Sequence, residues 1–199
     1  MKKLSYTLTV GLLILTACAS AAPTGTAVLP ATPPSQPTAT SIRALPTFSS
    51  PGNSIVWDAL QVTMDRLEIT QDYFTDYGSS RVPPAGQKFL WVHIQLKNTS
   101  QTEIEVPLSE HYSILYAGTE LKPSYGHRQG YSEYTAIGPT IFPDQQLDGR
   151  IRFDIPSAAE LRDLHFVFLP ESSQVGASYN SPNYPYADDK PTYVWKCDS

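Results

Sequence analysis

Cysteine is almost absent from this chain, with only Cys18 and Cys197 among its 199 residues. Two cysteines do not make the disulfide framework that holds small secreted domains together, so the core has to rest on hydrophobic burial. Methionine is equally scarce, since Met64 is the only one beyond the first residue. A copper carrier needs soft sulfur ligands, so this composition disfavours that class of protein.

Basic charge is also scarce. The chain has 14 Lys and Arg against 19 Asp and Glu, which gives a net charge of −5. A nucleic-acid-binding protein takes most of its affinity from contacts between basic side chains and phosphates, so nucleic acid is excluded as a partner. A polybasic attraction to anionic lipid headgroups is excluded for the same reason.

Long apolar runs are confined to the N-terminus, and no later stretch approaches the ~20 residues of a transmembrane helix. Residues 1–17 begin with two lysines and continue into a short apolar run, which predicts an export signal. Leu15-Thr16-Ala17-Cys18 resembles the lipobox of bacterial lipoproteins, in which the cysteine receives a diacylglyceryl group and becomes the new N-terminus. The resemblance implies an extracytoplasmic protein anchored by lipid on Cys18, at the cell surface or the periplasmic face. The alternative is an ordinary signal peptide with a chance cysteine.

The mature chain divides by composition into two parts. Residues 18–53 are rich in Pro, Thr, Ser and Ala, a composition that cannot offset the entropy of ordering and predicts a disordered tether. Residues 54–199 are long enough for one domain with a sizeable core, and they end in a Tyr-rich tail. Near the end of that tail, Cys197 is expected to be a shielded, inert thiol or to pair between two chains.

Alternating apolar and polar residues predict that the domain is all-β. In Lys88–Lys97 one face carries Leu90, Val92, Ile94 and Leu96, and the other carries Phe89, Trp91, His93 and Gln95. Further short strands are expected at residues 62–69, 104–107, 112–116, 151–155 and 164–168, with an edge strand at 192–196 and one helical turn at 157–161. Short strands separated by Pro- and Gly-rich turns favour an antiparallel immunoglobulin-like β-sandwich.

Two blocks of sequence resemble a known family. Residues 86–99 contain a strand that ends in Asn98-Thr99, and residues 149–156 follow the pattern Gly-x-Ile-x-Phe-x-x-Pro. Together they are similar to the telokin-like, immunoglobulin-like domains of uncharacterised bacterial surface lipoproteins. The resemblance covers roughly residues 54–170 and implies a β-sandwich. It implies no catalytic residues, because that family has no established general activity.

Catalytic and metal-binding patterns are weak. The nearest match to a nucleophile elbow surrounds Ser132, but it lacks the closing glycine. The four histidines are scattered, and His93 and His165 are expected at the surface. Pairs of loop acids such as Asp72 and Asp76, Asp144 and Asp148, or Asp188-Asp189 match no calcium-loop spacing. We therefore expect no cofactor, no metal and no enzymatic activity.

The pattern that stands out is aromatic. Tyrosines are crowded between residues 112 and 134 and again in the tail, and tyrosine combines apolar area with a hydrogen-bonding tip. The candidate binding surface comprises Tyr125, His127, Arg128, Tyr131 and Tyr134. The alternative is that these tyrosines cover the outer faces of the sheets and hold the C-terminal tail across Phe89 and Trp91.

The leading prediction is a non-enzymatic binding or protein-interaction module of the envelope, with a protein or glycan partner. An envelope hydrolase that uses Ser132 or loop carboxylates, and a purely structural spacer, stay open as alternatives.

Overall fold

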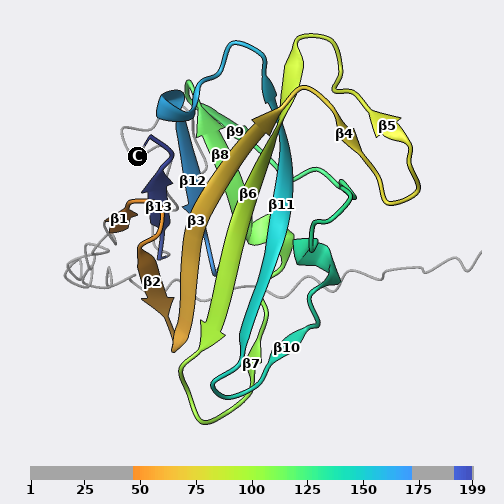
Figure 1. The fold of residues 1–199 in the computed structure, drawn as a ribbon. Helices are drawn as coiled ribbons and strands as arrows, with labels where there is room; N and C mark the ends of the chain where they lie inside the picture. Colours follow the sequence, from red (N-terminus) through yellow and green to blue (C-terminus); the bar gives the residue numbers. More distant parts are fainter. Residues whose placement is uncertain (1–46, 172–190, 199) are drawn as a thin grey trace, which may run out of the picture. The chain divides into compact units, whose positions relative to one another are not determined.

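Two β-sheets face each other across a hydrophobic core in the computed structural model, which describes residues 47–171 and 191–198 (Figure 1). The first sheet has the order β11-β6-β3-β2, formed by Gln146–Pro156, Gln87–Asn98, Leu60–Thr70 and Ser54–Trp57. The second has the order β1-β13-β12-β8-β9, formed by Thr47–Ser49, Tyr193–Lys196, Leu164–Phe168, Tyr112–Tyr116 and Thr119–Leu121. Among the described strands every pairing is antiparallel except that of β1 with β13. The predicted antiparallel β-sandwich is thus confirmed.

The core is built from alternate residues of the central strands, as expected for sheets with one buried face. In β6 the inward residues Leu90, Val92, Ile94 and Leu96 are completely buried. They face Ile114 of β8 and Phe166 of β12, which belong to the same cluster across the sandwich. Full burial of such a side chain contributes about 1.5–3 kcal/mol, so this alternation supplies the main driving force for the fold.

Two hairpins turn through only two residues each. Trp57 pairs with Leu60 across Asp58-Ala59, and both turn residues have positive φ angles of 44° and 66°. Tyr116 pairs with Thr119 across Ala117-Gly118, whose φ angles are 46° and 81°. Positive φ at both positions is the geometry that matches the twist of a tight hairpin.

Asn98 ends β6 and is completely buried. Its side-chain amide donates to the carbonyl oxygens of Thr102 at 2.6 Å and Ile141 at 3.0 Å, and its side-chain oxygen accepts from the backbone and hydroxyl of Ser100. These bonds close the turn after β6, at the strand end that the sequence indicated.

Several boundaries differ from the prediction. The predicted tether reaches residue 53, yet Thr47–Ser49 forms β1 and pairs with β13, so the folded part begins earlier. The predicted edge strand near the C-terminus is instead an interior strand, because β1 lies beyond it. The predicted helical turn at 157–161 is displaced to a short 3-10 helix, η3, at Leu161–Asp163. Residues 1–46, including Cys18, and 172–190 of the tail lie outside the described residues.

Cys197 is 2 % exposed and belongs to the main core cluster. Burial raises the pKa of its thiol to about 12, because the thiolate would lose its hydration there. A buried, protonated thiol is a poor nucleophile, so the geometry favours the inert thiol over pairing between chains.

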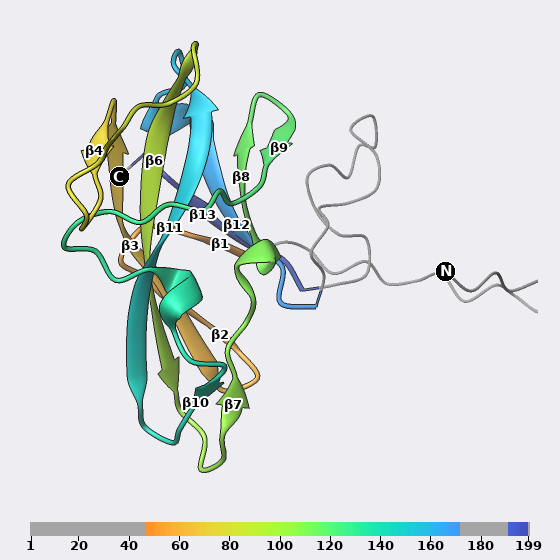
Figure 2. The same ribbon diagram turned by 90° about the vertical axis from the view of Figure 1, so that its right-hand side faces the viewer.

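Two short strand pairs and two 3-10 helices lie outside the two main sheets. Hairpin β4–β5 joins Tyr73–Phe74 to Ser80–Arg81, and β7 pairs with β10 through Ile104–Glu105 and Thr140–Ile141. Two 3-10 helices, η1 and η2, span Ser109–His111 and Tyr134–Ala136. Hairpin β4–β5 and the long loop after β9 lie on the outer side of the four-stranded sheet, opposite the five-stranded one (Figure 2). The described residues contain no helix long and apolar enough to span a membrane.

Candidate functional site

The outer face of the four-stranded sheet carries a row of buried aromatic residues. Phe89, Trp91 and His93 alternate along β6 with the inward core residues, so they point away from the sandwich core. They are nevertheless only 3 %, 1 % and 8 % exposed. The expectation that His93 lies at the surface is therefore wrong: its ring nitrogens lie 2.6 Å from Asp65 and 3.1 Å from Asp148.

Two tyrosines from outside the sheet cover this aromatic row. Tyr73 of β4 packs edge-on against Phe89 and Trp91, with ring centroids 5.0 and 5.1 Å apart. Tyr131 packs edge-on against Trp91 at 5.4 Å. Edge-to-face pairs of this kind stabilise beyond the area they bury. The outer face is thus closed by a second, small apolar cluster made of these four rings.

The segment that brings Tyr131 into place is residues 124–133, here called the strap. Both ends of the strap pair with the edge strand β11. The amide of Ser124 donates to the carbonyl of Arg152 at 2.8 Å, and the amide of Arg150 donates to the carbonyl of Ser132 at 2.8 Å. Between these points the strap crosses Arg152 at Gly126, where a Cβ atom would lie 2.7 Å from the Arg152 side chain. A side chain at position 126 would therefore displace the Arg152 side chain from its present place.

Tyr131 is held on three sides. The guanidinium groups of Arg128 and Arg150 lie 4.2 and 3.8 Å from its ring centroid, and its hydroxyl donates to Glu68. Arg128 also forms an ion pair with Glu68 at 2.8 Å. Burial alone would raise the pKa of Glu68, but the hydrogen bonds from Tyr131 and Arg128 and the attraction of nearby arginines outweigh it and lower that pKa. Tyr131 and Arg128 therefore fasten the strap to β3.

His127 joins the strap to hairpin β4–β5. Its Nε2 lies 2.6 Å from Oδ2 of Asp76 in the hairpin turn, and its Nδ1 bonds Oε1 of Glu133 at the end of the strap. The hydrogen bond to Glu133 and the charges of Glu133 and Asp76 raise the pKa of His127. The amide of Gln129 adds a bond of 2.8 Å to the carbonyl of Phe74. His127 thus serves as a pin between two surface segments.

Tyr134 does not belong to the surface that the sequence predicted. It is 3 % exposed, its hydroxyl donates to the carbonyl of Pro107 at 2.8 Å, and it lies 3.1 Å from the hydroxyl of Tyr112. Its backbone packs directly on Gly149, where a Cβ atom would lie 2.7 Å from the Tyr134 Cα. Because glycine leaves this space, the chain descends into the sandwich at Tyr134, and the ring joins the core.

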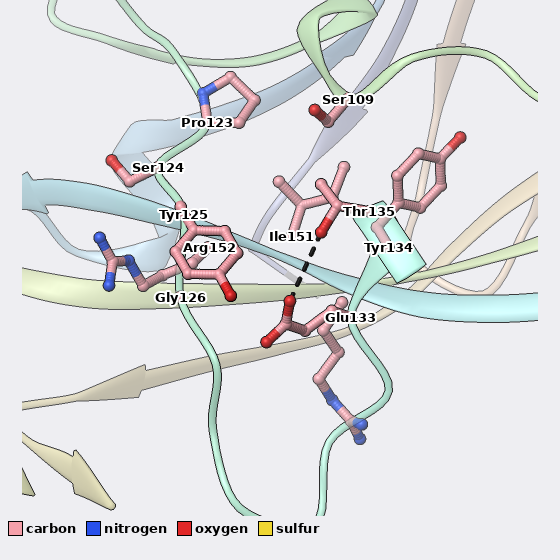
Figure 3. Close-up of a pocket in the computed structure, with 11 residues that line it drawn as sticks. Ser109, Pro123, Ser124, Tyr125, Gly126, Glu133, Tyr134, Thr135, Ile151 and Arg152 are labelled. Carbon is pink, nitrogen blue, oxygen red and sulfur yellow. Dashed lines mark hydrogen bonds between the residues drawn. The ribbon is translucent and has the colours of Figure 1, made fainter. Parts of the chain in front are cut away.

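Tyr125 is the predicted site residue that projects into solvent, with 76 % of its surface exposed. It separates two hollows that share Tyr125, Gly126 and Arg152. The first, the strap pocket, has a volume of about 140 Å³ and reaches Glu133, Thr135 and Ile151 (Figure 3). It is small and open at the edge of β11.

The second hollow, the hairpin pocket, has a volume of about 340 Å³ and lies between the strap and hairpin β4–β5. Its lining comprises Tyr73, Thr75, Arg81, Val82, Pro84, Phe89, Tyr125, Gly126, His127, Arg152 and Asp154. Two of these lining residues, Val82 and Tyr125, are 73 % and 76 % exposed, and Tyr77, which is 89 % exposed, lies beside His127 with the ring centroids 6.1 Å apart. Tyr77, Val82 and Tyr125 form what we call the apolar rim. Large apolar side chains gathered around one hollow are typical of interaction sites.

Catalytic geometry is weak in this region. The two ring nitrogens of His127 are engaged by Asp76 and Glu133, so the imidazole has no free nitrogen to activate the nearby Ser132. Across residues 47–171 and 191–198, no three side chains of the His, Cys, Asp and Glu types converge as a metal site would require. The arrangement is suited to contact and hydrogen bonding.

Sequence reasoning missed most of the hairpin pocket. The sequence predicted an acidic loop at Asp72–Asp76, whereas Tyr73 and Thr75 within it line the pocket. Arg152 alternates with core residues along β11, and that alternation was the available signal that it faces outward. Arg81 and Val82 carried no local signal, because only the fold of hairpin β4–β5 brings them beside Tyr125.

Comparison with known proteins gives a family and a fold. Residues 51–173 match a family described as "Domain of unknown function (DUF4352)". The yjhA protein from Bacillus subtilis has a TM-score of 0.51 and 14 % identity, covering 74 % of this chain and 97 % of its own. The secreted protein MPT63 from Mycobacterium tuberculosis has a TM-score of 0.50 and 12 % identity, covering 77 % and 98 %. At such identities the likeness shows the β-sandwich fold alone. Among curated proteins, none matches the sequence.

Proposed function

This chain belongs to the DUF4352 family, whose function is unknown, and we propose that it is a non-enzymatic binding module of the cell envelope that binds a protein partner at the hairpin pocket. The single observation that carries the proposal is the apolar rim, in which Val82 and Tyr125 line the pocket and Tyr77 lies beside its lining residue His127, all more than half exposed. Contiguous exposed apolar surface is unfavourable in water unless a partner covers it.

The chemistry of the pocket supports a protein partner. Interface centres are enriched in Tyr, Phe and Arg, and this pocket combines the rings of Tyr125 and Phe89 with the guanidinium groups of Arg81 and Arg152. The pocket is also supported by packed side chains. Its lining residues Tyr73 and Phe89 belong to a packed cluster with Trp91 and Tyr131, so little ordering entropy is lost on binding.

The N-terminal sequence supports a location outside the cytoplasm. The signal-like residues 1–17 and Cys18 would place a lipid anchor ahead of a Pro- and Thr-rich tether, and two or more acyl chains give stable membrane attachment. Labelling cells with radioactive palmitate tests this part separately. The wild-type chain should carry the label and stay in the membrane fraction, whereas Cys18→Ser should lose the label and be released. Membrane retention of unlabelled Cys18→Ser would contradict lipid anchoring.

Formaldehyde crosslinking in intact cells, followed by mass spectrometry, tests the binding role. The wild-type chain should yield a reproducible partner, and Tyr125→Ala should reduce the yield at least several-fold. Val56→Ala is the matched control, because Val56 is 60 % exposed on β2 and lies outside the pocket. Equal yields from wild type and Tyr125→Ala would contradict the assignment of the pocket, and a wild-type chain without any partner would favour a structural spacer.

A further inference from the structure

The hairpin pocket is a positively charged spot on an acidic protein. Its lining carries Arg81, Arg152 and His127 against one acid, Asp154, although acids outnumber basic residues in the chain as a whole by 19 to 14. His127 is engaged by Asp76 and Glu133, so its charge is already balanced. The two arginines therefore decide the charge that a ligand would meet.

Arg81 is free to bind a ligand. Its side chain is exposed at the end of β5, opposite Tyr73 in the hairpin register, and it forms no ion pair within residues 47–171 and 191–198. A planar guanidinium with unused donors is well suited to bind a carboxylate through two parallel hydrogen bonds.

Arg152 is held in place but only loosely neutralised. Its Nη1 donates to the hydroxyl of Tyr73 at 2.8 Å, whereas its contacts with Asp154 are long, at 3.5 Å from both Nη2 and Nε. Asp154 meanwhile accepts a hydrogen bond of 2.9 Å from the hydroxyl of Ser124. Part of the positive charge of Arg152 is therefore uncompensated where the guanidinium borders the pocket.

Apolar surface surrounds these charges. The ring of Phe89 is 3 % exposed and belongs to the pocket lining together with Val82, Pro84 and Tyr125. A volume of about 340 Å³ is near the lower limit for ligand pockets, enough for one or two side chains of a protein. An occupant that matches both features carries one carboxylate next to one apolar group.

We infer that the hairpin pocket receives a carboxylate of a protein partner, bound by Arg81 and Arg152, with an adjoining apolar side chain against Val82, Pro84 and Phe89. This inference rests on the proposed function and adds the chemistry of the partner. Charge complementarity and the apolar rim both favour a protein segment, since Tyr77 beside His127 extends the apolar contact beyond the pocket itself.

A pair of small probes tests the inference on the full chain. N-acetylphenylalanine carries a free carboxylate next to an apolar ring, and N-acetylphenylalaninamide differs only in lacking the charge. In NMR titrations the carboxylate should shift the backbone amide signals of Gly126 and Arg81, with affinity in the millimolar range. The amide should bind roughly tenfold more weakly, which corresponds to about 1.4 kcal/mol.

Substitutions of Arg81 test whether its guanidinium binds the carboxylate of the probe. Arg81→Gln should weaken binding of the carboxylate probe about tenfold and leave binding of the amide probe unchanged. Arg81→Lys should lose less affinity for the carboxylate probe, because it keeps the charge. Arg81 is exposed, so the rest of the spectrum should not move in either variant. Equal binding of the two probes, or of wild type and Arg81→Gln, would overturn the inference, as would the absence of binding by both.

A third probe separates the possible sources of a carboxylate. Glucuronate offers the same charge on a sugar ring, and tighter binding of glucuronate than of N-acetylphenylalanine would overturn the protein partner in favour of an acidic glycan. The proposed binding surface and the carboxylate specificity can be refuted independently of each other. If Tyr125→Ala abolishes crosslinking in cells while the two phenylalanine probes bind equally, the binding surface stands and the carboxylate does not.

Discussion

Replacing Tyr131 by alanine should destabilise the domain although the residue lies at its surface. The substitution removes the edge-on contact with Trp91, the two guanidinium contacts with Arg128 and Arg150, and the hydrogen bond to Glu68. An aromatic pair contributes about 0.5–1.5 kcal/mol, each exposed cation–π contact about 0.5–1, and a hydrogen bond to a charged group about 1.5–3. These contributions overlap, and the site is partly exposed to solvent, so the expected loss in unfolding free energy is about 3 kcal/mol.

Two controls make the result specific. Tyr131→Phe keeps the ring and should lose only about 1.5 kcal/mol, the lower end of the range for its hydrogen bond to a charged group. Tyr125→Ala removes a ring that is 76 % exposed, so it should stay within about 0.5 kcal/mol of wild type. Urea unfolding followed by tryptophan fluorescence measures all three, and in a domain of this size a loss of 3 kcal/mol lowers the melting temperature by roughly 6–12 °C.

A Tyr131→Ala variant as stable as wild type would refute this reasoning. It would mean that the strap contributes nothing to the fold, and the crowded tyrosines would then be available as a binding surface, as the sequence alone suggested. If Tyr125→Ala lowered the free energy of unfolding by as much as Tyr131→Ala, the reasoning would also be refuted, because the exposed ring would then be as important for stability as the fixed one.

Three further predictions concern other parts of the domain. The pKa of His127 is raised above its ordinary value of 6.5, so its stabilising link between hairpin and strap is fully present below pH 6.5 and is lost as pH rises through the raised pKa. The urea midpoint should therefore fall over that pH window. His127→Gln should abolish this pH dependence. In a Cys18→Ser chain the Cys197 thiol, with its pKa of about 12, should react with Ellman's reagent in denaturant but not in the native state. Rapid native labelling would contradict its burial. Ala59→Gly should raise the free energy of unfolding of the domain by roughly 1 kcal/mol, because Ala59 has a φ of 66° that glycine adopts without strain. An unchanged urea midpoint would show that this turn is not strained.

The fold could be predicted from local patterns because a two-residue alternation is a property of the sequence itself. Leu90, Val92 and Ile94 were assigned to the core from alternation alone, and they are completely buried there. Strand β1 could not be predicted in this way. Its three residues carry no alternation, and they are ordered by pairing with β13, nearly 150 residues further along the chain.

The candidate site was harder to predict, because tyrosines look alike in sequence. Tyr125, Tyr131 and Tyr134 lie within ten positions of one another, yet one is exposed, one seals an outer cluster and one is buried in the core. These fates depend on contacts with residues distant in sequence, such as Glu68 for Tyr131 and Gly149 for Tyr134. The sequence indicated the correct region, and only the fold distinguishes the free ring from the fixed ones.

Position-specific photo-crosslinking tests the central claim most directly. A photoreactive phenylalanine analogue is placed at position 125 of the full chain in living cells, with position 56 on β2 as the control at an exposed site away from the pocket. The account predicts a discrete adduct with one partner from position 125, and none from position 56. The same adducts from both positions, or none from position 125, would contradict the assignment of the hairpin pocket as the binding surface.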